Sequence, residues 1–161
     1  MISYDIIERI INEKLSETNI FLVDLKVSPS NQIVVFIDTN EGIGIQECIE
    51  ISKHIEGNLD REEDDFELQV SSPGMDLPFK VIQQYQKNLN REVKVYTEDG
   101  RKHQGFLTAV NEEELTITYD VKERIEGRKK RETVTKVETY YFNASDPSTK
   151  IKETKKVISF N

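Results

Sequence analysis

The chain has 161 residues, of which 36% are hydrophobic and 32% are charged, and its net charge is −8. No apolar run approaches the roughly 20 residues of a membrane-spanning helix, so we expect no contact with a membrane. The single cysteine, Cys48, excludes an internal disulfide framework and indicates a reducing, cytoplasmic location. A basic region followed by an apolar stretch is missing from the start of the chain, which predicts no secretory signal.

The first half of the chain predicts helices packed on a small sheet. Apolar residues recur three and four positions apart over 3–18 and 45–59, a spacing that predicts two helices. Alternating or continuous runs of β-branched and aromatic residues predict strands over 21–27, 33–37 and 66–71. The resulting order, α-β-β-α-β, is typical of a two-layer domain.

The third strand runs into a polar corner made of Ser71, Ser72, Pro73 and Gly74, followed by Asp76. Proline fixes its own φ and glycine adopts left-handed backbone easily, so the corner is predicted to be sharp and rigid. We predict that these five residues face a partner or lie between two domains. An equally open alternative is that the corner only locks the two domains together.

Beyond the corner the pattern changes to short strands. The predicted elements are a short helix over 80–88 and strands over 93–96, 101–110, 115–119, 134–142 and 156–160. Several short strands with little helix predict a small SH3-like (Sm-like) β-barrel. We therefore predict an α+β chain with an acidic α/β domain over 1–88 and a barrel domain over 89–161.

The charges are divided unevenly between these two halves. Residues 1–88 hold 7 Lys/Arg against 17 Asp/Glu, a net charge of −10, whereas residues 89–161 hold 15 against 13, a net of +2. An acidic domain attracts basic proteins, and a basic segment can contact nucleic-acid phosphate. The alternative is that the asymmetry only serves solubility.

The strongest charge signal is a basic loop at 122–131, with Gly127 at a predicted hairpin tip or flexible loop. Its six positive residues are Lys122, Arg124, Arg128, Lys129, Lys130 and Arg131. We predict that these side chains contact RNA phosphates and that the contacts weaken as salt increases. The alternative is a solvated loop without a partner.

Nothing in the sequence predicts an enzyme. His54 and His103 fall in different predicted domains, with no second His or Cys at metal-ligand spacing beside either. Cys48 lies among isoleucines and is interpreted as a small buried hydrophobic residue rather than a nucleophile. Ser71 and Ser72 lack the Gly-x-Ser-x-Gly frame of a serine hydrolase. We therefore expect no catalytic residues, no metal and no cofactor.

The element order, the corner and the predicted barrel together resemble the bacterial ribosome maturation factor RimP family. The stretches that carry the resemblance are 21–25, 35–38, 42–45, 70–76, 93–96 and 105–107. The resemblance implies a cytoplasmic, non-enzymatic assembly factor for maturation of the small (30S) ribosomal subunit. It also implies that the chain binds RNA of the immature subunit and a basic ribosomal protein, and we expect a monomer.

The chain departs from the family pattern at Leu77, where the family usually has an arginine before the second proline of the corner. Any contact made by that arginine is missing here. The basic loop 122–131 is also longer than the family pattern predicts. A second interpretation from the residues is a free-standing Sm/SH3-like RNA-binding regulator, which binds short RNA without a ribosomal particle.

Overall fold

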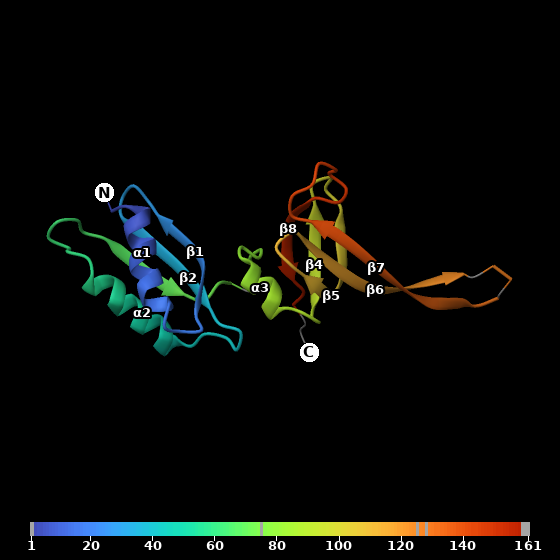
Figure 1. The fold of residues 1–161 in the computed structure, drawn as a ribbon, viewed down its shortest axis with the longest axis horizontal. Coiled ribbons are helices and arrows are strands. Elements are labelled where there is room, and N and C mark those ends of the chain that lie inside the picture. Colours follow the sequence, from blue (N-terminus) through green and yellow to red (C-terminus); the bar gives the residue numbers. More distant parts are fainter. Residues whose placement is uncertain (1, 75, 125, 128, 159–161) are drawn as a thin grey trace. The chain divides into compact units, whose positions relative to one another are not determined.

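The computed structural model describes residues 2–74, 76–124, 126–127 and 129–158. The chain divides into two compact units, Met1–Gly74 and Met75–Asn161. The described residues form three helices and two sheets, so the predicted α+β class is confirmed (Figure 1).

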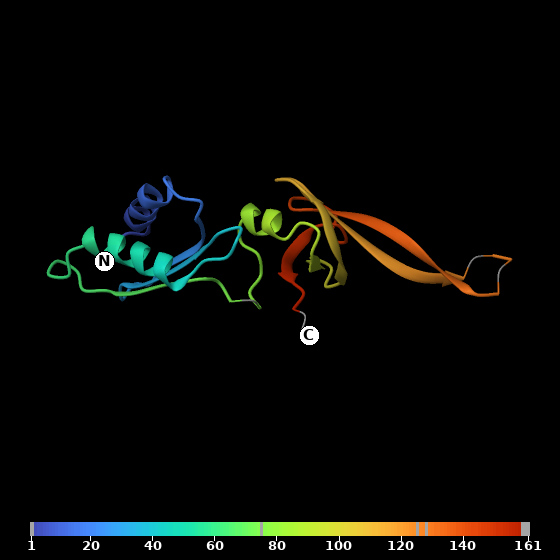
Figure 2. The same ribbon diagram turned by 90° about the horizontal axis from the view of Figure 1, so that it is seen from below.

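The first unit has the predicted order of elements. These are α1 (Tyr4–Leu15), β1 (Phe21–Val27), β2 (Gln32–Asp38), α2 (Ile45–Gly57) and β3 (Glu67–Ser71). Strand β2 lies in the centre of the sheet, antiparallel to β1 and parallel to β3. Both helices lie on the same face of this sheet (Figure 2).

Hydrophobic periodicity explains the core of this unit. Helix α1 buries its apolar residues at three- and four-residue spacing, and β2 buries every second residue, which are the periods of a helix and a half-buried strand. The buried apolar side chains of these two elements are Ile7, Ile10, Ile11, Leu15, Ile33, Val35 and Ile37. Full burial of one such side chain stabilises the folded state by about 1.5–3 kcal/mol.

The second unit is one short helix and an antiparallel sheet. Its elements are α3 (Ile82–Lys87), β4 (Glu92–Thr97), β5 (Lys102–Val110), β6 (Glu114–Arg124), β7 (Arg131–Tyr141) and β8 (Ile151–Lys156). The strand order is β7-β6-β5-β4-β8. Among the described residues this sheet does not close into a barrel. Its outer strands approach each other through an isolated bridge between Tyr141 and Lys150. The SH3-like character of the unit stays a prediction.

The two units divide at residue 74/75, whereas the sequence suggested 88/89. Helix α3 belongs with the second sheet because Tyr85 is buried there and meets the ring of Phe142 edge-on, at 5.2 Å between centroids. With this boundary the charge asymmetry grows. The first unit has 5 Lys/Arg and 16 Asp/Glu, a net of −11, and the second has 17 and 14, a net of +3.

Strand β8 spans Ile151–Lys156 and not 156–160, and residues 159–161 lie outside the described part of the chain. The apolar residues from 157 onward favoured the later position. The observed strand instead buries Ile151 and the polar Thr154. The Thr154 hydroxyl accepts a hydrogen bond from the Tyr85 hydroxyl at 2.9 Å, which makes its burial tolerable.

Strands β6 and β7 form a hairpin much longer than the predicted strands 115–119 and 134–142. They pair from Glu114 opposite Tyr141 to Arg124 opposite Arg131. The hairpin extends as a two-stranded ribbon beyond the other strands of its sheet (Figure 2). The basic run therefore begins and ends within the strands instead of forming a loop throughout.

Candidate functional site

The basic hairpin presents its charges on two different faces. In an antiparallel ribbon, directly opposed residues share a face and successive residues alternate between faces. The register therefore places Lys122, Arg124 and Arg131 on one face, because Arg124 lies opposite Arg131 and Lys122 lies two residues away. All three side chains are exposed. We call this the cationic face; Asp120 and Glu114 are the carboxylates of β6 that share it.

The opposite face of the hairpin carries Glu123, Glu132 and Glu138, together with Lys136. The ammonium of Lys136 lies 2.6 Å from a carboxylate oxygen of Glu123. This hydrogen bond and the attraction between the two charges raise the pKa of Lys136. Because its lysine is already paired, this face has an excess of carboxylates and is unsuited to phosphate.

Two tyrosines keep one of these carboxylates ionised. Tyr119 donates its hydroxyl to Glu138 at 2.8 Å, and Tyr140 donates to the other carboxylate oxygen. Hydrogen bonds to the ionised form favour it, so they lower the pKa of Glu138. Burial, followed by the bond to Glu138, raises the pKa of Tyr140. The packing at the base of the hairpin therefore stabilises a negative charge on this face, at Glu138.

The remaining predicted phosphate contacts lie at the hairpin tip. Lys129 and Lys130 are exposed, and Gly127 has a φ of 84°, the left-handed backbone that a tight turn requires. Of the two predicted alternatives at Gly127, a hairpin tip or a flexible loop, the pairing of Arg124 with Arg131 favours the hairpin tip. Arg128 lies outside the described residues.

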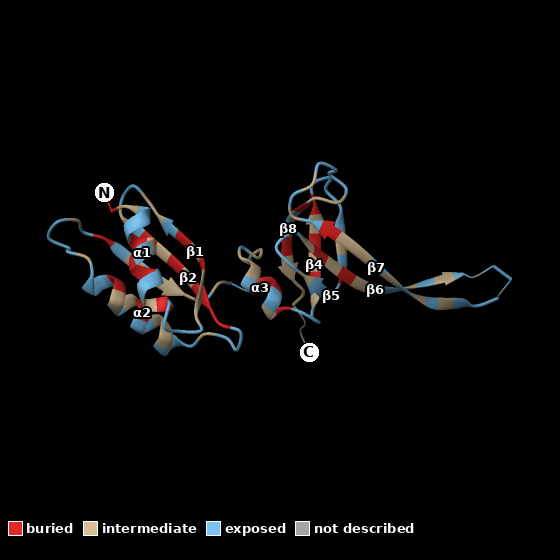
Figure 3. Cartoon of the chain, in the orientation of Figure 1, coloured by how far each residue is buried: buried red, intermediate tan, exposed pale blue. Residues whose placement is uncertain are grey.

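The cationic face continues onto an exposed apolar row of the sheet. Phe106 of β5 and Val137 of β7 both lie opposite Thr118 of β6, so the three residues form one row on this face. Phe106 is 50% exposed and Val137 is 64% exposed. Figure 3 shows the distal hairpin in the colours of half-buried and exposed residues, with buried residues confined to its base. Sequence patterns did not reveal this row, because its members come from three strands.

The polar corner begins at a groove of the first unit. Ser71 and Ser72 line a cavity of about 470 Å³ between α2 and β3, beside Ile45 and Ile49. Ser71 is half-buried and Ser72 is exposed. These two corner residues therefore lie where a partner could reach them.

The other corner residues are not brought to this groove by any described contact. Pro73 is half-buried and Gly74 is exposed at the end of the first unit. Asp76 is exposed and belongs to the second unit. A partner-facing or interdomain role for the whole corner stays a prediction.

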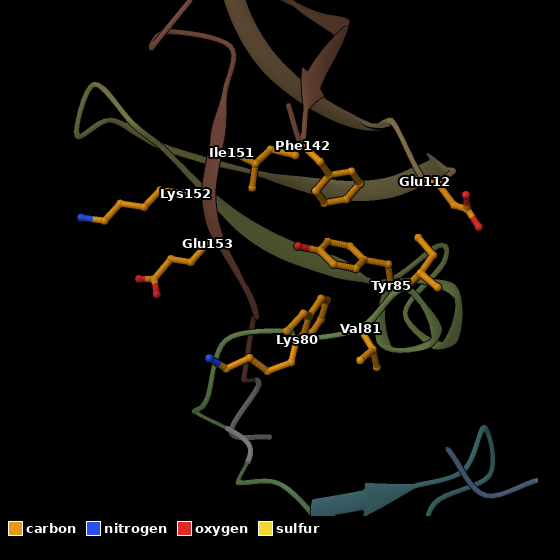
Figure 4. Close-up of a pocket in the computed structure, with 10 residues that line it drawn as sticks. Lys80, Val81, Tyr85, Glu112, Phe142, Ile151, Lys152 and Glu153 are labelled. Atoms are coloured by element: carbon orange, nitrogen blue, oxygen red, sulfur yellow. The ribbon is translucent and has the colours of Figure 1, made fainter. Parts of the chain in front are cut away.

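Sequence reasoning missed an aromatic pocket of about 430 Å³ in the second unit (Figure 4). The rings of Phe79 and Phe142 each meet Tyr85 edge-on, at 4.9 and 5.2 Å between centroids. The backbone N–H of Phe79 donates to the carbonyl of Thr154 at 2.8 Å. Two lysines and two glutamates line the pocket as well, so neither sign of charge dominates. We interpret the cluster as the packing that fixes α3 to the sheet.

The two histidines and the cysteine make packing and hydrogen-bonding contacts within the fold. The Nε2 atom of His54 lies 3.0 Å from the carbonyl of Ile10, and the ring of His103 lies 4.6 Å from that of Tyr140. Burial raises the pKa of the Cys48 thiol, which disfavours the reactive thiolate. Within the described ranges no three His, Cys, Asp or Glu side chains gather as a metal site would require. No helix in the same ranges is long and apolar enough to cross a membrane.

The fold is that of a two-unit α+β protein, with an acidic α/β unit followed by an antiparallel sheet that bears a basic hairpin. The model of the RimP N-terminal domain matches residues 10–76. The ribosome maturation factor RimP of Flavobacterium psychrophilum is 37% identical over 129 residues, which cover 80% of this chain and 83% of that protein.

Two further relatives with the same name are similar to this chain. The RimP of Porphyromonas gingivalis is 38% identical over 135 residues, covering 83% of this chain and 89% of that protein. The RimP of Christiangramia forsetii is 35% identical over 118 residues, covering 73% and 76%. The chain belongs to the ribosome maturation factor RimP family, which confirms the resemblance seen in the sequence.

Proposed function

We propose that this chain is a non-enzymatic, cytoplasmic assembly factor for maturation of the small (30S) ribosomal subunit. The observation that carries the proposal is its 35–38% identity, over most of its length, to proteins named ribosome maturation factors. The opposite net charges of the two units support it, because an assembling subunit offers both RNA phosphates and basic proteins.

In the RNA arm of the proposal, the cationic face binds phosphates of the immature subunit. Lys122, Arg124 and Arg131 are exposed on a ribbon that extends from its sheet, and no salt bridge engages any of them among the described residues. When an unpaired Lys or Arg side chain binds an RNA phosphate, it releases a counterion that was condensed on the RNA. This release favours binding at low salt concentration. Lys129, Lys130 and Arg128 would extend these contacts at the tip.

In the protein arm, the first unit binds a basic ribosomal protein. Its net charge of −11 attracts such a protein and speeds its association. Ser71 and Ser72 line an open groove of this unit, which supports a partner-facing role for the corner. We place Pro73, Gly74 and Asp76 in the same role, as the continuation of that segment.

Sedimentation of a cell lysate tests the proposal. The chain should migrate with free small subunits and be depleted from mature ribosomes. Its absence from the small-subunit fraction would contradict the assembly role. Size-exclusion chromatography of the purified chain should show a monomer.

A free-standing RNA-binding regulator is the second candidate. It is favoured by the exposed Phe106 beside the cationic face, because exposed aromatic rings stack on single-stranded bases. For this function the second unit would act as an SH3-like (Sm-like) platform. Recovery of short RNA with the chain, without co-migration with small subunits, would favour this candidate over the first.

A further inference from the structure

Strand β3 leaves one edge of its sheet open. The strand order β1-β2-β3 makes it an outer strand, and no other strand pairs with its free edge among residues 2–74 of the described chain. Natural proteins usually block such edges with lysine, proline or a bulge. The five residues of β3, Glu67–Ser71, contain neither lysine nor proline, and their pairing with β2 is regular. The edge can therefore accept another strand.

The backbone groups that face this edge can be assigned. The N–H of Glu67 donates to the carbonyl of Asn31 at 3.0 Å, on the side of β2. Because the backbone groups of successive residues point to opposite sides of a strand, those of Leu68 and Val70 point to the open edge. These two residues offer the donors and acceptors that an added strand needs.

An apolar groove lies alongside this edge. It is the 470 Å³ cavity between α2 and β3, and its lining includes Ile45, Cys48 and Ile49 of the helix. Ile45 is 81% exposed and Ile49 is 40% exposed, and their four-residue spacing puts them on one side of α2. An exposed apolar pair beside an unpaired strand is typical of an interaction site.

The negative charge around the groove indicates which kind of molecule binds to it. Residues 41–60, which contain α2, hold five carboxylates and one lysine, within a unit of net charge −11. This charge repels both RNA and a second copy of the same unit, and it attracts a basic polypeptide. An extended polypeptide satisfies the open backbone groups, and its alternate side chains can enter a neighbouring groove.

We propose that an extended basic segment of the partner protein pairs with β3 as a fourth strand and places apolar side chains over Ile45 and Ile49. The proposal deepens the protein arm of the proposed function and rests on it. Main-chain hydrogen bonds to Leu68 and Val70 hold the segment, and the groove selects its apolar side chains. Ser71 and Ser72 line the same groove, which gives the corner a place in this site.

Binding of individually purified proteins of the small subunit to the full-length chain tests this site. The double variant Ile45→Ser/Ile49→Ser should bind the partner about tenfold or more weakly, because both side chains would lie at the centre of the contact. The control is Ile6→Ser, since Ile6 of α1 is 43% exposed in the same unit. This control should bind normally.

Amide hydrogen exchange supplies the second readout. When the partner binds, exchange at Leu68 and Val70 should slow about tenfold or more, since these N–H groups become hydrogen-bonded. The N–H of Glu67 already pairs toward β2 and should change little. Normal binding by the double variant, or unchanged exchange at both amides, would overturn the β3 site while leaving the assembly role intact.

Two other outcomes would also reject the proposal. If the wild-type chain binds none of the small-subunit proteins, the protein arm of the proposed function fails together with this site. If exchange at Leu68 and Val70 slows only with increasing concentration of the chain itself, the edge pairs with a second copy.

Discussion

Removing the cations of one hairpin face should change the salt dependence of RNA binding by a calculable amount. The variant Lys122→Ala/Arg124→Ala/Arg131→Ala deletes three exposed charges from the cationic face. Each phosphate contact contributes about 0.7 to 0.9 to the slope of log affinity against log salt concentration, with the lower value for single strands. If all three side chains contact phosphate, the slope should therefore fall by about 2 to 3.

Fluorescence anisotropy with small-subunit ribosomal RNA, measured at several salt concentrations, gives these slopes. The sharpest comparison is between Lys122→Ala and Lys136→Ala, because each removes one lysine from the same hairpin. Lys122 is exposed on the cationic face, whereas Lys136 is paired with Glu123 on the other face. Lys122→Ala should lower the slope by about 0.7 to 0.9, and Lys136→Ala should leave it unchanged.

Equal slopes for the two lysine variants would refute the assignment of RNA to one face. An unchanged slope for the triple variant would refute the phosphate contacts altogether. The unfolding free energy of the triple variant should stay within about 0.5 kcal/mol of the wild type, since exposed side chains contribute little to stability. This measurement separates loss of contact from loss of fold.

Two predictions concern the stability of the second unit. Gly105→Ala should lower its unfolding free energy by about 1–3 kcal/mol in denaturant titrations, because a Cβ there would lie 2.9 Å from the carbonyl oxygen of Thr118. The pKa of Glu138 is lowered in the fold, so its contribution to stability is present above the unfolded pKa and is lost as the pH falls through the folded value. Glu138→Gln should therefore weaken the acid sensitivity of thermal unfolding below about pH 4.

Each of these predictions has a matched comparison. Gly57→Ala is the control for Gly105→Ala, because no atom lies within 4 Å of its added Cβ and its φ is not positive. Equal losses of stability in both glycine variants would contradict the close approach at β6. The same acid-induced decline in wild type and Glu138→Gln would show that other carboxylates control it.

The local part of the fold was predictable because it depends on local periodicity. Isoleucines three and four residues apart specify α1, and alternation specifies β2, so the α-β-β-α-β order followed from the sequence. The division between the units was not predictable in this way. It depends on Tyr85 packing against Phe142 and Thr154, which are more than fifty residues away along the chain. No local pattern encodes such a pairing.

The candidate site was predictable in composition but not in arrangement. The count of cations identified the basic hairpin, and Gly127 marked its tip. The division into two faces depends on register, which is set at the base of the hairpin, where Leu115 and Ile117 are buried. Beyond Val121 and Val134, which lie opposite each other on the acidic face, the described residues of both strands are polar or charged, so hydrophobicity no longer indicates which face an individual residue joins. The β3 groove was missed because Ile45 was interpreted only as the first residue of a predicted helix.

The length of the hairpin sets how far its cations extend from the sheet, and this length is independent of the buried core that stabilises the unit. Between residues 120 and 135 no described residue is buried or packs against the core, so this part of the hairpin can change length without disturbing the core. Two residues added to each strand would carry the tip about 7 Å outward and keep every side chain on its present face. One residue added to each strand would instead turn the distal cations to the acidic side. Among natural relatives, the length of each hairpin strand should therefore vary by two residues at a time.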